Sequence, residues 1–422
     1  MEQPIVIETR EELIYLLSEA SQLEHMILCE YLYAAFSLKR GADEGITPEQ
    51  LEMTKRWERA VSEVAAQEML HLTLASNLLT AIGASPCFHR PNFPKFAKYF
   101  PPGMQFSLLP FGEDALIHFL FLERPEGMER SDAPEYAVLA EANPAAQGSE
   151  VVPMVEDFQT VGHLYRGIEQ GFRHLVDKYG ERQVFVGPPQ AQATQDYFNW
   201  DELIPVRDLD SAITAIETIV EMGEGARGDW QDSHYGKFLR VYEEYRAAKD
   251  ADPDFEPARP VVPAVCRLLS DESNLDLIED PDTARVTDLF NASYELLLQV
   301  LVRFFIHEDE NPAEFQALAD LAVSLMFGPL RTLGRLLTTL PVGPGLPGKT
   351  AGPTFEIFGL RSYLLPHRDS AWVLLHERLL ELAEDCAEIE TEETKRTLDR
   401  IAESLRKGAA KLEPYLEPGA SA

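Results

Sequence analysis

The sequence has few basic side chains for its length: across 422 residues, 37 Lys and Arg stand against 71 Asp and Glu, a formal charge of -34. A polyanion of this size repels phosphate backbones and anionic lipid headgroups. We therefore expect neither a nucleic-acid partner nor a membrane-surface partner. Long apolar runs are also missing, because no stretch approaches the ~20 residues that a membrane-spanning helix needs.

Cysteine is scarce as well. The four cysteines, Cys29, Cys87, Cys266 and Cys386, lie far apart, and none belongs to a CxxC motif. Such spacing is typical of a reduced chain rather than of a disulfide framework. The first residues, MEQPIVIETREEL, show no basic segment followed by an apolar run, so we expect no signal peptide. Together these features predict a cytoplasmic protein.

Convincing strand patterns are absent, and apolar residues recur at helical spacing over most of the chain, which predicts an all-α fold. Thr9 and Thr47 are placed as N-caps, the first in a capping box with Glu12. A Pro-, Gly- and Phe-rich stretch over 84–153 holds one short helix near GEDALIHFLFLERP. The other helices are predicted over 11–38, 48–82, 155–179, 208–225, 234–249, 283–307, 312–340 and 370–412.

A Pro- and Asp-rich segment, DADPDFEPARPVVP, begins at Asp250 and is typical of a linker. It predicts two domains. The first covers residues 1–250, and the second is a C-terminal helical domain over 251–422. A Gly/Pro-rich loop over 341–359 interrupts the second domain.

Helix geometry, at about 100° per residue, converts spacing into orientation. On the helix over 11–38, Glu24 lies in the middle of an apolar stripe, whereas Glu30 lies on the polar side and is expected to face outward. On the helix over 48–82, Glu68 is central to the stripe and His71, three residues later, shares its face. The pattern therefore predicts two carboxylates and one imidazole in the core.

A buried, ionised carboxylate is strongly destabilising unless it is paired or bound to a metal ion. In the four-helix carboxylate bundle, glutamates from two helices and Glu-x-x-His pairs from the other two surround metal ions. Glu24, Glu68 and His71 fit this arrangement. Carboxylate and imidazole ligands favour iron, as one ion or two, with manganese as the second choice.

The other two helices depart from this pattern. Glu169 lies at the edge of the apolar stripe over 155–179, and we predict it as a ligand, with His163 as the alternative. The helix over 208–225 has no His three residues after a Glu. Glu224 lies nearest to its inward face, and His234 follows a glycine-rich interruption. We predict Glu224 and His234 as ligands in place of a second Glu-x-x-His pair.

Four segments resemble, in order and spacing, the ferritin-like domain of the iminophenyl-pyruvate dimer synthases, which act in bis-indole pathways such as those of violacein and rebeccamycin. They are QLEHMILCEYLYAAFSLK, EVAAQEMLHLTLASNLLTAIGASP, TVGHLYRGIEQGF and IVEMGEGARGDWQDSHYGKF. The resemblance covers most of residues 10–250 and, through KTAGPTFEIF, part of the second half. It implies a ferritin-like four-helix bundle with long inserted loops, and an iron-type site. The positions that match its motifs are Glu24, Glu68, His71, Glu224 and His234.

The leading hypothesis is a metal-dependent oxidoreductase that acts on a small amino-acid-derived substrate such as an imine, in secondary-metabolite biosynthesis. Tyr31 and Tyr165 lie on inward helix faces, where they donate hydrogen bonds to a bound oxygen species or simply pack. A second hypothesis is a non-catalytic metal-binding or storage protein, and a third is an all-helical interaction protein without metal. The oligomeric state stays open, a homo-oligomer included.

Overall fold

The computed structural model describes residues 5–93, 95–96, 105–126, 128, 158, 160–225, 229–263, 278–306, 309–358, 367–389 and 394–416. The chain divides into two compact units. Unit 1 comprises Met1–Cys87, Pro94–Gln195 and Trp200–Ala258, and unit 2 comprises Phe88–Phe93, Asp196–Asn199 and Arg259–Ala422. The domain division at residue 250 remains a proposal.

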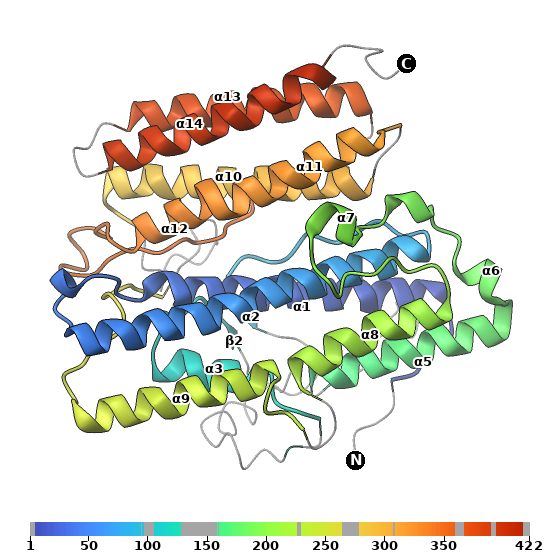
Figure 1. Cartoon of the computed structure of the whole chain (residues 1–422), viewed down its shortest axis with the longest axis horizontal. Coiled ribbons are helices and arrows are strands. Elements are labelled where there is room, and N and C mark those ends of the chain that lie inside the picture. Colours follow the sequence, from blue (N-terminus) through green and yellow to red (C-terminus); the bar gives the residue numbers. More distant parts are fainter. Residues whose placement is uncertain are drawn as a thin grey trace. The chain divides into compact units, whose positions relative to one another are not determined.

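Two long helices, α1 (Arg10–Ser37) and α2 (Pro48–Ala81), lie side by side in unit 1 (Figure 1). Both begin where the sequence predicts. The Thr9 side chain accepts a hydrogen bond from the backbone of Glu12, and the Glu12 carboxylate accepts one from the backbone of Thr9. Thr47 caps α2 in the same way. These capping boxes set the start of each helix, and so the face on which Glu24 and Glu68 lie.

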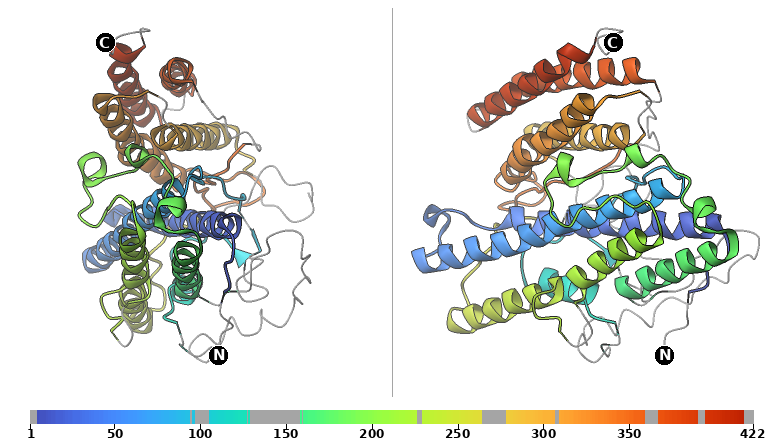
Figure 2. Two further views of the ribbon diagram at one scale, coloured as in Figure 1. Left: turned by 90° about the vertical axis from the view of Figure 1, so that its right-hand side faces the viewer. Right: turned by 45° about the vertical axis from the view of Figure 1, so that its right-hand side comes forward.

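The other half of the bundle is made of four shorter helices. They are α3 (Glu113–Leu122), α5 (Val161–Tyr179), α8 (Leu209–Gly223) and α9 (His234–Ala251). Figure 1 shows α3 and α5 arranged end to end, as α8 and α9 are, and the end-on view in Figure 2 agrees. α3 packs on α9 and α5 packs on α8. Two of the four sides of the bundle are therefore interrupted near their middle.

The remaining elements of unit 1 are short, which confirms the all-α class. Two strands of two residues each, β1 (Lys95–Phe96) and β2 (Gln105–Phe106), form an antiparallel pair. Much of the predicted loop over 84–153 lies outside the described residues, as do the first residues of the helix predicted over 155–179. The short helices are η1 (Ala42–Glu44), α6 (Glu181–Val184), η4 (Pro189–Ala191) and α7 (Gln195–Phe198), the last of which extends into unit 2.

The prediction that Glu30 faces outward is wrong. Its side chain is fully buried, one carboxylate oxygen accepts from the backbone N–H of Ser107 at 2.8 Å, and the other lies 3.0 Å from His118 Nε2. The segment after β2 and helix α3 contact this side of α1, which periodicity alone predicts to be exposed. Glu30 therefore holds the inserted segment against the bundle.

Unit 2 consists of helices too. α10 (Pro281–Phe305) packs on α11 (Pro312–Leu325) and on α13 (Arg368–Glu388), and α13 packs on α14 (Lys395–Leu412). The π-turn η6 (Met326–Leu330) joins α11 to α12 (Arg331–Leu337). It contains Pro329, whose missing N–H interrupts the regular α-helical hydrogen bonds at this point. The short turn η7 (Glu413–Tyr415) follows α14.

The single helix predicted over 370–412 is wrong, since α13 and α14 are separate helices. Each has an apolar stripe, containing Leu375, Leu379 and Leu382 on α13 and Leu398, Ile401 and Leu405 on α14. Because the chain turns between α13 and α14, the two apolar stripes can pack against each other. In one continuous helix they would follow each other along the axis and could not be in contact.

No disulfide links the described cysteines Cys29, Cys87 and Cys386 to one another, and Cys266 lies outside the described residues. Among the helices described, none has both the length and the apolar character required to cross a bilayer.

The burial of Glu30 leads to a stability prediction. Glu30→Ala leaves the backbone N–H of Ser107 and the ring of His118 without their acceptor, so we expect the free energy of unfolding to fall by about 3 kcal/mol. Urea denaturation measures this, with Glu11→Ala, an exposed glutamate on the same helix, as the matched control. Equal, small losses in both variants would show that the buried contacts of Glu30 do not stabilise the fold.

Candidate metal centre

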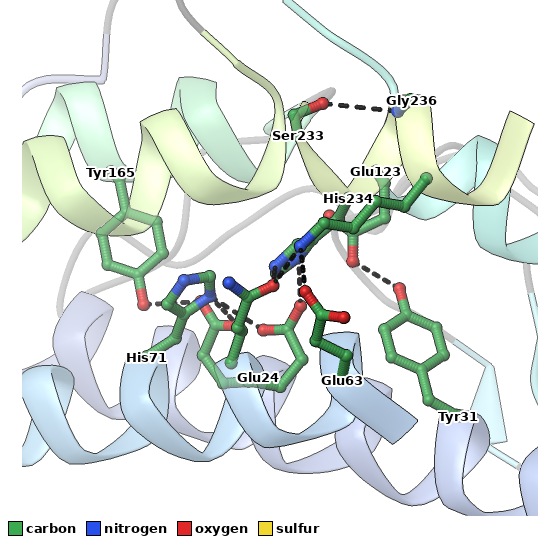
Figure 3. A network of polar contacts seen from close by, with 12 residues as sticks. Glu24, Tyr31, Glu63, His71, Glu123, Tyr165, Ser233, His234 and Gly236 are labelled. Carbon is green, nitrogen blue, oxygen red and sulfur yellow. Dashed lines mark hydrogen bonds and ion pairs between the residues drawn. The ribbon is translucent and has the colours of Figure 1, made fainter. Parts of the chain in front are cut away.

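Five acidic and imidazole side chains converge inside unit 1. Figure 3 labels four of them, Glu24, His71, Glu123 and His234. Glu24 comes from α1, Glu68 and His71 from α2, Glu123 from the residue after α3, and His234 from the first residue of α9. None is more than 4% exposed. The interrupted sides of the bundle thus contribute residues from helix ends, and the continuous helices contribute residues from their middles.

Glu68 lies between the two histidines. Its Oε2 is 2.9 Å from His71 Nδ1, and its Oε1 is 2.7 Å from His234 Nδ1. Glu24 Oε2 is 3.9 Å from His71 Nδ1, and Glu123 Oε2 is 3.6 Å from His234 Nδ1. The two imidazole rings stack with centroids 5.3 Å apart. Each histidine therefore faces Glu68 and one outer carboxylate.

Two tyrosines hold the outer carboxylates in place. Tyr165 donates a hydrogen bond to Glu24 Oε1 at 2.7 Å, and Tyr31 donates one to Glu123 Oε1 at 2.5 Å. Figure 3 shows the tyrosines on opposite sides of the cluster. The ring of Tyr31 packs edge-on against Phe119 and Phe238, with centroids 4.6 and 4.8 Å away. Aromatic rings therefore enclose this side of the cluster.

Burial and mutual repulsion dominate the electrostatics. Burial raises the pKa of Glu24, and the charge of Glu68 raises it further. Burial lowers the pKa of His71 to about 4. Burial also acts to lower the pKa of His234, but Glu68 and Glu123 outweigh it and raise that pKa to about 10. In the described part of the chain, no Lys or Arg forms an ion pair with these carboxylates. The buried charge of the cluster is therefore balanced either by protons on Glu24 and His234 or by a metal ion.

The residues present fit a metal ion. His71 Nε2 is buried and has no hydrogen-bond partner, and His234 Nδ1 makes no well-directed hydrogen bond despite its short distance to Glu68. Over the residues that the structure describes, Glu68, His71 and His234 form the one group of three ligand atoms within 4.8 Å of one another. Carboxylate oxygen and imidazole nitrogen together suit first-row transition metals such as iron and manganese.

Two of the predicted ligands do not join this cluster. Glu169 forms an ion pair of 2.7 Å with Arg173, one turn later on α5, and its side chain is 23% exposed. Its alternative, His163, is buried in the first turn of α5, outside the group. Glu224 is buried, but its carboxylate accepts backbone N–H bonds from Gly162 at 2.6 Å and Glu126 at 2.9 Å. It thus caps the start of α5.

Glu123 is the residue that periodicity did not single out. The sequence places the third-helix carboxylate within 155–179, whereas this side of the bundle begins with α3. A signal was present, because Leu116, Phe119 and Glu123 share one helix face at spacings of three and four residues. A single acid at the end of the apolar run ALIHFLFLE marks an unusual position.

Comparisons with known proteins agree with this geometry. The family model described as Ferritin-like matches residues 17–243. The chain is 29% identical to dichlorochromopyrrolate synthase from Lentzea aerocolonigenes, over 94% of this chain and 41% of that protein. It is also 29% identical to 2-imino-3-(indol-3-yl)propanoate dimerase from Chromobacterium violaceum, over 83% of this chain and 34% of that protein. The chain thus spans about two fifths of the length of the first relative and about one third of the length of the second.

A solved structure of a ferritin-like protein from Caulobacter vibrioides is similar as well. It has a TM-score of 0.48 and 18% sequence identity, covering 74% of this chain and 96% of that one. The relatives named as a synthase and a dimerase agree with the resemblance that the sequence motifs indicate.

The burial of the Glu224 carboxyl group predicts a pH effect on stability. Burial raises its pKa from 4.5 to about 7, although the N–H groups of Gly162 and Glu126 act to lower it. Its contribution to folding is therefore complete at low pH and is lost as the pH rises towards 7. Glu224→Gln cannot ionise, so we expect the stability of the variant relative to the wild type to rise by up to about 3 kcal/mol between about pH 4.5 and 7.5.

Urea denaturation at several pH values measures this difference. Glu169→Gln, which changes a partly exposed carboxylate on the neighbouring α5, is the control and should show no comparable rise. A constant difference between Glu224→Gln and the wild type over this range would mean that the carboxyl group ionises normally in the folded protein.

Proposed function

This chain belongs to the Ferritin-like family, and from this premise we propose that it is a metal-dependent oxidoreductase acting on a small amino-acid-derived substrate. The observation that supports the proposal best is the burial of three carboxylates with two imidazoles and no ion-paired Lys or Arg in the described residues. The proposed ligands are Glu24, Glu68, His71, Glu123 and His234. Glu169 and Glu224 are left out because their carboxylates have other partners.

Iron is the proposed metal, with manganese as the second choice, because both accept mixed oxygen and nitrogen ligands. Glu68 presents one oxygen to each histidine, an arrangement that suits two ions as well as one. When bound, iron would supply the redox chemistry that no side chain of the cluster provides. The chain itself supplies the ligand geometry and a site shielded from water.

Tyr31 and Tyr165 are proposed to act mainly by positioning the outer carboxylates. Their hydroxyl groups donate to Glu123 and Glu24, so neither proton is available to another acceptor while these bonds persist. Burial raises the pKa of both phenols well above the ordinary value, with the neighbouring carboxylates adding to the effect. Both tyrosines therefore keep their protons and remain donors.

The proposed substrate class follows from the relatives. One of them is named for 2-imino-3-(indol-3-yl)propanoate, an imine with an amino-acid carbon skeleton. We propose that this chain acts oxidatively on an imine of the same kind, in a secondary-metabolite pathway. Because it spans less than half of either relative, its product is a separate question from theirs.

A second candidate is a non-catalytic metal-binding or storage protein. The observation that favours it is the near-complete burial of all five proposed ligands, which leaves little of the cluster exposed to an incoming molecule. The two candidates share a metal centre and differ in whether a substrate is converted.

Metal analysis tests what the two candidates have in common. The protein is produced with iron supplementation and purified without chelator. We expect about one or two iron ions per chain in the wild type and less than about 0.2 in Glu68→Ala or His71→Ala, because removing a ligand abolishes the site. Glu169→Ala should keep the wild-type content. A wild type below about 0.2 ions per chain, with iron and with manganese, would refute both candidates.

Substrate conversion separates them. An amino-acid oxidase acting on L-tryptophan generates the indolyl imine in the same vessel, and mass spectrometry follows the products. The oxidoreductase predicts a new, oxidatively coupled product that depends on iron and is lost in His71→Ala, since that variant lacks a proposed ligand. Consumption of dioxygen without any new product would favour the storage protein.

A further inference from the structure

A chain of polar contacts leads from the cluster to the surface of unit 1, through residues that bind no metal in the proposal above. His234 Nε2 lies 3.2 Å from Gln67 Oε1, Lys237 Nζ lies 2.7 Å from the same oxygen, and Glu63 Oε1 lies 3.3 Å from Lys237 Nζ. Building on the proposed function, we infer that Gln67, held by Lys237, is a positioning residue that determines which nitrogen of His234 faces the metal.

Lys237 determines which way round the amide of Gln67 lies. An ammonium group has three N–H donors and no lone pair. The atom of Gln67 that lies 2.7 Å from Lys237 Nζ must therefore be the oxygen, since the amide nitrogen would meet it donor to donor. The exposed carboxylate of Glu63 lies on the other side of Lys237, with Oε1 3.3 Å from Nζ. The orientation of the amide thus follows from chemistry.

The amide oxygen in turn determines the tautomer of His234. It carries no hydrogen, so the contact of 3.2 Å requires His234 Nε2 to be the donor. The lone pair of a neutral His234 is then on Nδ1, which lies 2.7 Å from Glu68 Oε1 and 3.6 Å from Glu123 Oε2. Histidine ligands ordinarily bind the metal through one ring nitrogen while the N–H of the other ring nitrogen donates a hydrogen bond.

The two positioning residues come from the same two helices as the ligands that they serve. Gln67 precedes Glu68 on α2, and Lys237 lies three residues after His234 on α9, so one turn of α9 presents both side chains to α2. His71 differs, because its Nε2 is buried without a hydrogen-bond partner. The two histidines are therefore held differently, and only His234 has this link to a surface charge among the contacts described.

Three variants test the inference. Gln67→Met keeps the length of the side chain but removes the acceptor, Gln67→Glu keeps an acceptor for both donors, and Lys237→Met removes the residue that orients the amide. Calorimetric titration of the metal-free proteins with Mn²⁺ reports the affinity. We expect Gln67→Met to bind Mn²⁺ about 10- to 100-fold more weakly, Lys237→Met to lose less, and Gln67→Glu to stay near the wild type.

Stability measurements on the same metal-free variants separate positioning from packing. If Gln67 only ties α2 to α9, Gln67→Met lowers the free energy of unfolding but the folded protein binds Mn²⁺ as the wild type does, and the inference is overturned. If the wild type itself binds no Mn²⁺ or Fe²⁺, the proposed function fails first, so the two failures are distinguishable.

Nitrogen-15 spectra of histidine-labelled protein loaded with Zn²⁺ provide a readout that does not depend on affinity. The His234 signals are identified by their loss in His234→Gln. We expect a protonated Nε2 and a metal-bound Nδ1 in the wild type and in Gln67→Glu, and faster exchange of the Nε2 proton in Gln67→Met. A metal-bound Nε2 in the wild type would contradict the inference.

Discussion

The burial of three carboxylates against two imidazoles is the constraint on which unit 1 depends. Glu24, Glu68 and Glu123 repel one another where water is excluded, and the nearest bases are His71 and His234. Such a group is destabilising unless some of the acids are protonated or a positive charge lies among them. A proton on His234 supplies that charge in part, because its pKa is raised to about 10. A metal ion bound by the carboxylate oxygens and imidazole nitrogens would supply more positive charge than one proton does. This is the physical reason for the proposed ligand set.

The interruptions of the bundle serve the same constraint. Glu123 follows the last residue of α3 and His234 is the first residue of α9, so both lie where the helix ladder ends. The start of a helix disfavours a cationic side chain, through the backbone N–H groups that point outward there. This effect opposes the two neighbouring carboxylates, which outweigh it and raise the pKa of His234 to about 10. The interruptions of the bundle therefore bring Glu123 and His234 into the cluster, and the carboxylates set the charge of the imidazole.

Periodicity predicts the half of the site that lies on continuous helices. Glu24, Glu68 and His71 lie on α1 and α2, which run without a break, so an angle counted along the sequence holds across the whole stripe. The same counting fails beyond Gly223 and before Val161, because the chain leaves the helix and a new phase begins. There, the pattern predicts that Glu224 faces inward as a ligand, yet its carboxylate caps the start of α5.

Glu30 shows a different limit of the sequence argument. Periodicity shows which side of a helix is polar, but not whether another segment later covers that side. The backbone N–H of Ser107 and the imidazole of His118 come from an inserted segment, and they turn a polar face into a buried contact. Only the tertiary arrangement reveals such pairs, because the sequence around each residue gives no sign of its partner.

The site consists of two chemically different halves, and Glu68 belongs to both. One half holds Glu24, His71 and Tyr165, and the other holds Glu123, His234 and Tyr31, with each tyrosine on its outer carboxylate. The halves differ because burial lowers the pKa of His71 to about 4, whereas the two neighbouring carboxylates raise that of His234 to about 10. Two ions bound here would therefore be inequivalent. An ion on the His234 side must displace a proton, and one on the His71 side meets an imidazole that is already neutral.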